Sequence, residues 1–382
     1  MLTLFPGRVG GSETNVRGLL GAFAAGQGPD EVVVLANRHV VGPYAGFQRG
    51  PVRIEHVRSY RSGDSEPTRL AAMTFAALAP GRVARDMPAG LDVVHYPVTV
   101  PIPRFDGPRV ITLFDVQHLE MPEFFSRAER TYRRFAYDRA ARQATLVITS
   151  SEHSRERAIE LVGVDPGRVE VVPLGIDHER FRLDPADDDS ALAGLDLPER
   201  FVVYPANLWP HKNHARLVAA LARTSDRSLE LVLTGQPYGR LDALMDEARR
   251  AGVSERVHHL GFVRSDALPA LYRRARALVF PSVYEGFGAP PLEAMACGCP
   301  VASSPRASLG ELLADAALTF DPEDPAAIAA AIDRVTGDKT LRERLRSAGL
   351  ERAGRYTWEA AAAGHVAAYQ RAGSSPSLMK RR

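Results

Sequence analysis

Short apolar runs recur along this chain, and a longer amphipathic stretch follows each of them. They read LDVVHYP, RVITLFD, ATLVITS and RVEVVPL in the first half, and FVVYPAN, LELVLTG, RVHHLGFV, ALVFPS and CPVASS in the second. Apolar runs of this length are typical of buried parallel strands, and the stretches between them of helices. The pattern therefore predicts an α/β protein with two doubly wound domains.

Composition excludes several classes of protein. A length of 382 residues favours two domains, and a formal net charge of +2 gives no argument for a nucleic-acid partner. The sequence contains neither an apolar run long enough to span a bilayer nor the features of a signal peptide, which predicts a cytoplasmic protein. Cys297 and Cys299 are separated by one residue, so they suggest neither a disulfide framework nor a zinc site.

Polar and turn-rich stretches suggest where the domains begin and end. The expected parts, in order, are a first domain (1–178), an exposed connection (179–199), a second domain (200–355), a helix (356–371) and a disordered tail (372–382). Asp187 to Asp189 formally match an Asp-x-Asp metal signature, but their context favours a solvated turn. Because only MLTLF precedes the first glycine turn, the first strand is short or the translation start lies upstream.

The segment EGFGAPPLEAMACG carries the most specific signals. The residues around Glu285, including Pro290, prevent a regular helix, whereas Pro291 suits a helix start and Gly298 a helix end. We expect a helix from Pro291 to Cys297. Its N-terminus would present free N–H groups and a partial positive charge at the strand ends, where a diphosphate would fit.

Two carboxylates accompany this helix start. Glu285 lies on the loop and Glu293 in the expected first turn, and each is able to accept hydrogen bonds from sugar hydroxyls. The alternative is that Glu293 only complements the helix dipole and that Glu285 is an ordinary surface residue.

Lys212 lies at another strand-to-helix turn, in YPANLWPHKNHARLV. A positive charge near a helix start is slightly unfavourable unless an anion is bound there. Lys212 is therefore a candidate anion ligand, although a solvated surface lysine remains the alternative.

The segment GRVGGSETN is a third candidate site. Gly7, Gly10 and Gly11 let a backbone approach a phosphate closely, and Ser12 or Thr14 is placed to cap a helix. Neither this spacing nor that of EGFGAPP is the dinucleotide fingerprint, so a nicotinamide enzyme is weakly supported. A plain tight turn is the alternative.

Asp115 and His118 follow the apolar run RVITLFD, in ITLFDVQHLEMPEFFS. Polar residues at the carboxyl end of a parallel strand face the binding crevice of a doubly wound domain. His118 is therefore a candidate for proton transfer or for orienting a hydroxyl. A loop histidine with no chemical role is equally consistent with the sequence.

A basic aromatic helix is expected from Glu123 to Arg142. Phenylalanine and tyrosine residues are interleaved with six arginines, at positions 127, 130, 133, 134, 139 and 142. Such a helix suits a peripheral contact with an anionic membrane or a lipid-diphosphate acceptor. A partly packed helix with a solvated arginine face is the alternative.

In this order, the clusters resemble the family 4 glycosyltransferases, retaining enzymes of the GT-B fold, in which two Rossmann-like domains face each other across a crevice. The most specific element is the E-x(7)-E motif of Glu285 and Glu293, reinforced by PHKN at Pro210 and by HLGFVRSDALPALYRRA from His259. The resemblance covers nearly the whole chain. It implies an acceptor-side first domain, a nucleotide-sugar-binding second domain and a final helix that crosses back to the first.

The resemblance also implies roles for individual residues. Lys212 would bind the donor diphosphate, Glu293 the ribose, and Glu285 the transferred sugar. The other donor-binding residues would be Gly10, Gly11, Gly261, Phe262, Val263, Gly286, Phe287, Gly288 and Leu292. Asp115, His118 and Glu285 are the candidate catalytic residues, and no metal or cofactor is expected beyond the donor itself.

Two positions depart from the family pattern. Relatives commonly carry an arginine where this chain has Asn207, and many carry a histidine where it has Phe114. One charge contact to the diphosphate and the usual pocket histidine are therefore missing at their positions.

The residues of these motifs are similar to those of the family branch that transfers mannose during assembly of bacterial cell-envelope polysaccharides. The expected reaction is metal-independent transfer of a mannose-like hexose, with GDP-mannose as the favoured donor and a glycan or lipid-linked acceptor. Two alternatives are a nucleotide-sugar epimerase of the GT-B fold and a catalytically silent homologue that binds the donor.

Overall fold

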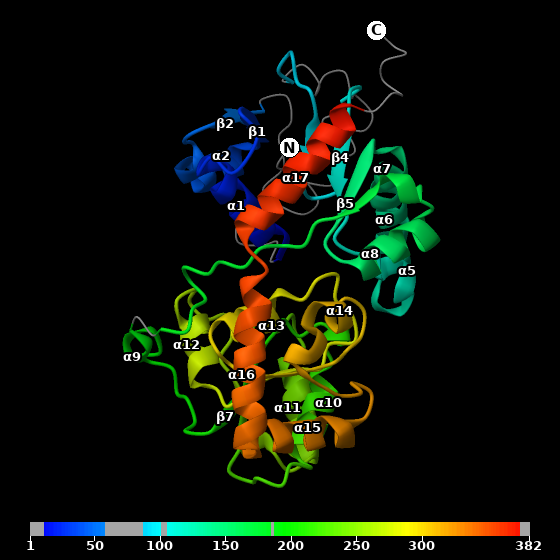
Figure 1. Cartoon of the computed structure of the whole chain (residues 1–382). Helices are drawn as coiled ribbons and strands as arrows, with labels where there is room; N and C mark the ends of the chain where they lie inside the picture. The colour runs from blue at the N-terminus through cyan, green and yellow to red at the C-terminus, as the bar shows by residue number, and fades with distance from the viewer. Residues whose placement is uncertain (1–10, 58–86, 101–104, 185–186, 375–382) are drawn as a thin grey trace. The chain divides into compact units, whose positions relative to one another are not determined.

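The computed structural model of the chain describes residues 11–57, 87–100, 105–184 and 187–374 (Figure 1). The chain forms two compact units. Unit 1 comprises Met1–Gly175 and Trp358–Arg382, and unit 2 comprises Ile176–Thr357. Each unit contains parallel β-sheet, and the doubly wound α/β architecture expected from the apolar runs is confirmed.

Unit 1 combines parallel strands with short helices. Its described elements are α1 (Gly11–Ala24), β1 (Val32–Ala36), α2 (Arg38–Tyr44), η1 (Ala45–Phe47), β2 (Val52–His56), β3 (Val94–Tyr96), β4 (Arg109–Thr112), α5 (Gln117–Glu120), η3 (Pro122–Phe124), α6 (Arg127–Arg133), η4 (Arg134–Asp138), α7 (Arg139–Gln143), β5 (Leu146–Thr149), α8 (Glu152–Arg157), η5 (Ala158–Val162), η6 (Pro166–Arg168), β6 (Val169–Val171) and α17 (Trp358–Gly373).

The four strands predicted in the first half form one parallel sheet in the order β3-β4-β5-β6. Their central residues are buried, among them Val110, Ile111, Val147 and Ile148. This continuous burial explains why the strands appear in the sequence as apolar runs without alternation. The parallel pair β1-β2 was not predicted. The short first strand expected before Pro6 lies outside the described residues.

Helix α17 packs on unit 1 against α1, β4 and β5 (Figure 1). A Cβ atom at Gly18 of α1 would lie 2.0 Å from the Trp358 ring, so the close approach of the two helices depends on this glycine. Tyr369 on α17 hydrogen-bonds His95 Nδ1 at 2.8 Å, and His95 Nε2 lies 2.8 Å from the Thr112 hydroxyl. Polar contacts therefore fix α17 on the sheet in addition to apolar packing.

Unit 2 alternates strands and helices throughout. Its described elements are α9 (Asp188–Ala191), β7 (Phe201–Pro205), η7 (Pro210–Lys212), α10 (His214–Leu221), β8 (Glu230–Thr234), α11 (Leu241–Arg250), η8 (Ser254–Arg256), β9 (Val257–His259), α12 (Ala267–Arg274), β10 (Leu278–Phe280), α13 (Ala289–Ala296), β11 (Val301–Ser303), α14 (Leu309–Leu313), η9 (Ala314–Ala316), β12 (Leu318–Thr319), α15 (Pro325–Gly337) and α16 (Lys339–Gly354).

The sheet of unit 2 has the order β12-β11-β10-β7-β8-β9, and every pair is parallel. It contains all five strands predicted in the second half and adds the two-residue β12. Because the strands are parallel, the loops after β7, β8, β9 and β10 all lie at the carboxyl edge of the sheet, where ligands bind in doubly wound domains.

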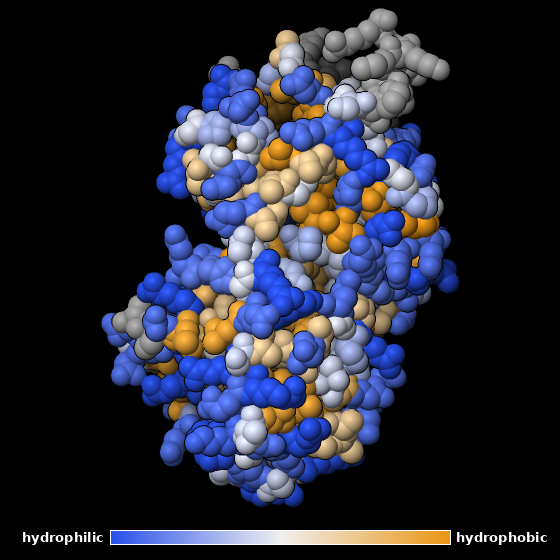
Figure 2. Space-filling model, viewed as in Figure 1, coloured by the Kyte–Doolittle hydropathy of each residue, from blue (hydrophilic) through white to orange (hydrophobic). Residues whose placement is uncertain are grey.

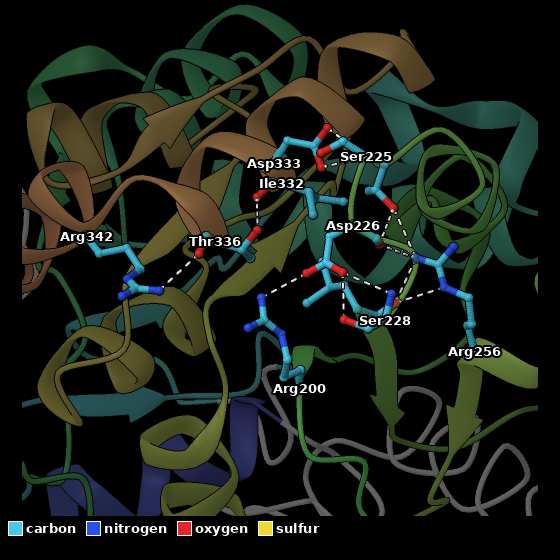
Figure 3. A network of polar contacts seen from close by, with 11 residues as sticks. Arg200, Ser225, Asp226, Ser228, Arg256, Ile332, Asp333, Thr336 and Arg342 are labelled. Carbon is cyan, nitrogen blue, oxygen red and sulfur yellow. Dashed lines mark hydrogen bonds and ion pairs between the residues drawn. The ribbon is translucent and has the colours of Figure 1, made fainter.

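A polar network closes the opposite edge of this sheet (Figure 3). Arg256, just before β9, donates to the carbonyl oxygens of Leu229 and Asp226 and to the Thr224 hydroxyl, at 2.7 to 3.1 Å. The Asp226 carboxylate accepts from Arg200, just before β7, at 2.8 Å. Side chains thus satisfy the backbone carbonyl groups at the strand starts. This network lies at the edge opposite to the one where ligands bind in doubly wound domains.

The described residues of the connection expected over 179–199 are mostly exposed, as expected, but several of them contact α12. The segment belongs to unit 2, where the buried Phe181 packs against Tyr272 and where Asp188 forms an ion pair with Arg273 of α12. The Asp187 carboxylate accepts a hydrogen bond from the Ser190 N–H at the start of α9. Phe181, Asp188 and Asp189 thus attach this segment to α12.

The C-terminal helix extends to Gly373, two residues beyond the expected end, and most of the expected tail lies outside the described residues. The face drawn in Figure 2 is mostly hydrophilic, with apolar residues in small scattered patches. Within the described ranges, no helix is both long and apolar enough to cross a bilayer.

Candidate functional site

The loops after β7 and β10 are joined at the carboxyl edge of the unit 2 sheet. The Val283 N–H and the Ser282 hydroxyl both donate to the carbonyl oxygen of His211, at 2.9 and 3.2 Å. The Asn213 amide donates to the carbonyl oxygens of Pro281 and Pro322, at 3.1 and 2.7 Å. These bonds bring the Lys212 motif and the Glu285 motif, which are 73 residues apart, to one place.

Lys212 and Glu285 form an ion pair there. Lys212 Nζ lies 2.5 Å from Glu285 Oε1, and the two side chains are 17% and 12% exposed. The Tyr204 hydroxyl donates to the Lys212 carbonyl oxygen at 2.8 Å, and Lys212 Nζ lies 5.8 Å from the centre of the Phe280 ring. Lys212 is thus a fixed and largely buried cation rather than a solvated surface lysine.

Ser308 holds the Glu285 loop in position, although the sequence analysis did not identify it. Its buried hydroxyl lies 2.9 Å from the carbonyl oxygen of Glu285 and 2.8 Å from that of Phe287. The Phe287 ring packs edge-on against Tyr356. A serine in the polar stretch SSPRASLG carries no signal that distinguishes it from a turn residue, because its partners come from a different loop.

Helix α13 begins two residues earlier than predicted, at Ala289, and ends at Ala296. Pro290 and Pro291 both fit its first turn, since the first N–H groups of a helix need no intrahelical acceptor. Gly288 precedes it with φ 99°, a conformation that favours glycine. Glu293 therefore lies in the second turn, and the side chain of Leu292 is fully buried.

Glu293 is a half-buried residue whose carboxyl group lies near Tyr272, Arg180 and Asp177. Burial raises its pKa to about 7, which the nearby Arg180 partly opposes. Its Oε2 lies 3.4 Å from the hydroxyl of the buried Tyr272. Near neutral pH it is therefore divided between a form that donates a hydrogen bond and a form that only accepts them.

The loops after β8 and β9 continue this edge. The Gly235 N–H donates to the Gly261 carbonyl oxygen at 2.8 Å, and Gly261 adopts φ 67°. Phe262 is 80% exposed, whereas Val263 is half-buried. The residues proposed from the sequence to meet the base thus lie on the same sheet edge as Lys212 and Glu285.

Three candidate residues of unit 1 are Gly10, Gly11 and Asp115. Gly10 lies outside the described residues, and Gly11 begins the described part of α1, so Ser12 and Thr14 lie inside this helix and do not cap it. Asp115 accepts a hydrogen bond from the Gln117 N–H at 3.0 Å and is half-buried.

His118 is enclosed in unit 1. Its side chain is 0% exposed, and its Nε2 lies 3.0 Å from the Asp138 carboxylate. Proton transfer to a substrate requires contact that this side chain lacks here, so the arrangement suits a role in positioning the 117–138 segment. The sequence could not predict this pairing, because Asp138 lies 20 residues from His118 and no local pattern links the two.

The basic aromatic segment is helical without interruption from Arg127 to Gln143, so the expected helix forms but begins four residues later than Glu123. Ser126 caps α6 through a capping box with Glu129, and the π-helical turn η4 lies between α6 and α7. Arg133 lies over the Phe125 and Tyr137 rings, and Phe135 is 60% exposed.

Comparison with known proteins identifies the family. A model described as "Glycosyltransferase Family 4" matches residues 9–180, and one described as "Glycosyl transferases group 1" matches residues 187–352. The O-antigen chain mannosyltransferase B of Escherichia coli is 30% identical over 305 residues, which cover 79% of this chain and 80% of that protein. The chain belongs to the family 4 glycosyltransferases. A D-inositol 3-phosphate glycosyltransferase of Frankia alni is 34% identical over 242 residues, covering 60% of this chain and 59% of the relative.

Solved structures show the fold of this glycosyltransferase to be GT-B. HepE of Anabaena, solved in complex with UDP-glucose, superposes with a TM-score of 0.72 at 21% identity, covering 95% of this chain and 96% of that one. Sucrose-phosphate synthase of Thermosynechococcus elongatus superposes with a TM-score of 0.73 at 22% identity, covering 94% and 93%. The expected fold and family are therefore confirmed.

Asn207 and Phe114, the two positions that depart from the family pattern, each accept a hydrogen bond from another part of the chain. The Asn207 side chain accepts a hydrogen bond from the Gln236 N–H at 2.8 Å, so it links two loops where relatives commonly carry an arginine. The Phe114 carbonyl oxygen accepts from the Ser154 hydroxyl at 3.1 Å.

Proposed function

We propose that this glycosyltransferase transfers a mannose-like hexose from a nucleotide diphosphate sugar, with GDP-mannose favoured, to a glycan or lipid-linked acceptor. The observation that carries the donor assignment is the buried Lys212–Glu285 pair beside the N-terminus of α13. A cation and a helix N-terminus suit the diphosphate, and the carboxylate suits sugar hydroxyls. The preference for mannose is supported by the similarity to O-antigen chain mannosyltransferase B.

The proposed mechanism is metal-independent and retains the configuration of the anomeric carbon. Lys212 and the α13 N-terminus stabilise the charge that develops on the departing diphosphate. Glu285 accepts hydrogen bonds from the sugar as the anomeric carbon becomes oxocarbenium-like. The acceptor hydroxyl attacks from the face that the diphosphate leaves, its proton passing to a departing phosphate oxygen. Asp115 is the carboxylate of unit 1 proposed to orient the acceptor, and the Gly10–Gly11 backbone approaches the phosphates.

A donor panel tests this function without knowledge of the acceptor. We expect one nucleotide sugar among the GDP-, UDP- and ADP-linked hexoses to bind and to be hydrolysed slowly, equally with and without EDTA. Release of an isomerised nucleotide sugar would indicate an epimerase instead, and binding without hydrolysis or transfer would indicate a silent homologue. A requirement for added divalent cation would contradict the metal-independent mechanism.

Glu293 predicts a pH dependence of donor binding. Ribose hydroxyls donate hydrogen bonds, so the donor binds the ionised form of Glu293, whose pKa in the free protein is raised to about 7. Affinity for the nucleotide sugar should therefore rise about tenfold between pH 6 and pH 8. Isothermal titration with the intact nucleotide sugar measures this, because its diphosphate does not titrate in that range. Glu293→Gln should remove the dependence; an unchanged profile would contradict the role of Glu293.

The exposed part of α6, η4 and α7 is proposed as a peripheral membrane contact. It presents Arg127, Arg134 and Arg139 together with Phe135. Reversing the three arginines to glutamate should weaken binding to vesicles containing anionic lipid by at least about 100-fold, since each basic residue contributes on the order of 1 kcal/mol and the new carboxylates are repelled. The matched control reverses Arg227, Arg249 and Arg250 of unit 2. Equal losses in both variants would mean that only net charge matters.

A further inference from the structure

Trp209 and Tyr238 stack on each other at the carboxyl edge of the unit 2 sheet. Their ring centres are 4.4 Å apart with an angle of 27° between the ring planes, and they are 41% and 51% exposed. Trp209 follows β7 and Tyr238 follows β8. We call these two side chains the aromatic platform.

The aromatic platform is held by its two loops. The Gln236 N–H donates to Asn207 Oδ1 at 2.8 Å, and the Leu208 N–H donates to the Gln236 carbonyl oxygen at 3.0 Å. Tyr238 adopts φ 45°, a left-handed conformation that is rare for a bulky residue. Strained backbone that carries a large exposed side chain is common at binding sites, and here it keeps the Tyr238 ring against Trp209.

The two segments that carry the aromatic platform contain few charged residues. The segment 206–211 contains no acidic residue or fixed cation, and burial lowers the pKa of His211 to about 3, so that it is uncharged. In the segment 236–240 the only charged side chain is Arg240. The low charge of these two segments favours an uncharged ligand over a phosphate.

The platform also lies next to the proposed donor site. The Lys212 N–H donates to the Trp209 carbonyl oxygen at 2.9 Å, so one tight turn, η7, carries both side chains. A ligand that stacks on Trp209 would thus bind to the same turn that carries Lys212, the cation assigned to the diphosphate.

We propose that the aromatic platform binds a pyranose ring of an oligosaccharide acceptor, beyond the ring that receives the new sugar. This proposal rests on the proposed function and adds that the acceptor is a saccharide chain. The C–H face of a pyranose packs on the outer face of one of the two stacked rings, while its hydroxyl groups remain in water. The low charge of the segments 206–211 and 236–240 matches such a ligand.

Intrinsic fluorescence tests the proposal directly, because the chain has only two tryptophans and the other, Trp358, belongs to unit 1. Titration with linear α-mannotriose should change the emission of the native protein. Trp209→Ala and Tyr238→Ala should each weaken binding of the trisaccharide at least tenfold by calorimetry. Trp209→Phe should retain most of the affinity but lose the emission change. Phe135→Ala, which removes an exposed aromatic ring of unit 1, should have no effect.

Titration of the same variants with GDP and UDP separates the alternatives. If Trp209→Ala weakens nucleotide binding and leaves mannotriose binding unchanged, the platform stacks a base, and the saccharide proposal is wrong. If neither ligand is affected, the platform is not a binding site. In either case, donor binding that is lost in Lys212→Ala would leave the proposed function intact. Circular dichroism of each variant confirms that it is folded.

Discussion

Lys212→Ala is expected to lower the rate of sugar transfer by about 10²- to 10³-fold, the loss typical of removing one preorganised group that stabilises developing charge. The native lysine is held between Glu285 and the Phe280 ring, and the one other lysine of unit 2, Lys339, lies at the start of α16. The effect should appear in kcat with the donor saturating, measured by release of the nucleoside diphosphate.

The control variants separate chemistry from stability. Lys339→Ala removes an exposed lysine and should leave kcat unchanged. Because Lys212→Ala leaves Glu285 without its partner in a largely buried position, the double variant Lys212→Met/Glu285→Gln shows whether the native pair contributes to folding. A Lys212→Ala protein with the native melting temperature and a kcat within a factor of three of native would refute the role of Lys212.

Gly235→Ala should destabilise the protein by about 3 kcal/mol or more. Gly235 follows β8 with φ 123°, and a Cβ atom there would lie 2.7 Å from the backbone carbonyl group of Ala206. Backbone at that distance cannot rotate away as a side chain can. The alanine would push the loop after β8 away from the loop after β7, so the free energy of unfolding and donor affinity should both fall in chemical denaturation and binding experiments.

Gly239→Ala is the matched control for this prediction. Gly239 lies on the same loop with φ 73°, but no atom lies within 4 Å of the position of its Cβ. Only the backbone preference is then lost, which costs about 1 kcal/mol. Equal losses for the two variants would show that the close approach to Ala206 has no energetic consequence.

The strands were the part of the fold that the sequence predicted best. Fully buried parallel strands must be apolar along their whole length, so β3 to β11 are visible as runs. Strand β12 is too short to form a run, and the separate pair β1-β2 was also missed. The predictions of helix starts were less accurate. Two consecutive prolines fit the first turn of α13 equally well, and the sequence cannot choose between them.

For the candidate site, too, local sequence patterns predicted some residues and missed others. Local patterns of glycine, proline and charge at strand ends led to the prediction of Glu285, Glu293 and Lys212 as site residues, and the structure places all three at one edge of the sheet. It could not identify Ser308, whose hydroxyl acts on a loop 21 to 23 residues away. Nor could it show that His118 is enclosed with Asp138, since burial depends on the elements that pack around it.

The sequence by itself thus determined the α/β class, most of the strands and the position of the motifs proposed to bind the donor, because each follows from a local pattern of burial or turn residues. The tertiary structure alone decided that Lys212 pairs with Glu285, that residues 179–199 pack on α12 and that Trp209 stacks on Tyr238. These are contacts between loops that follow different strands. A sheet places such loops at one edge only after its strands have taken their order, and no local pattern encodes that order.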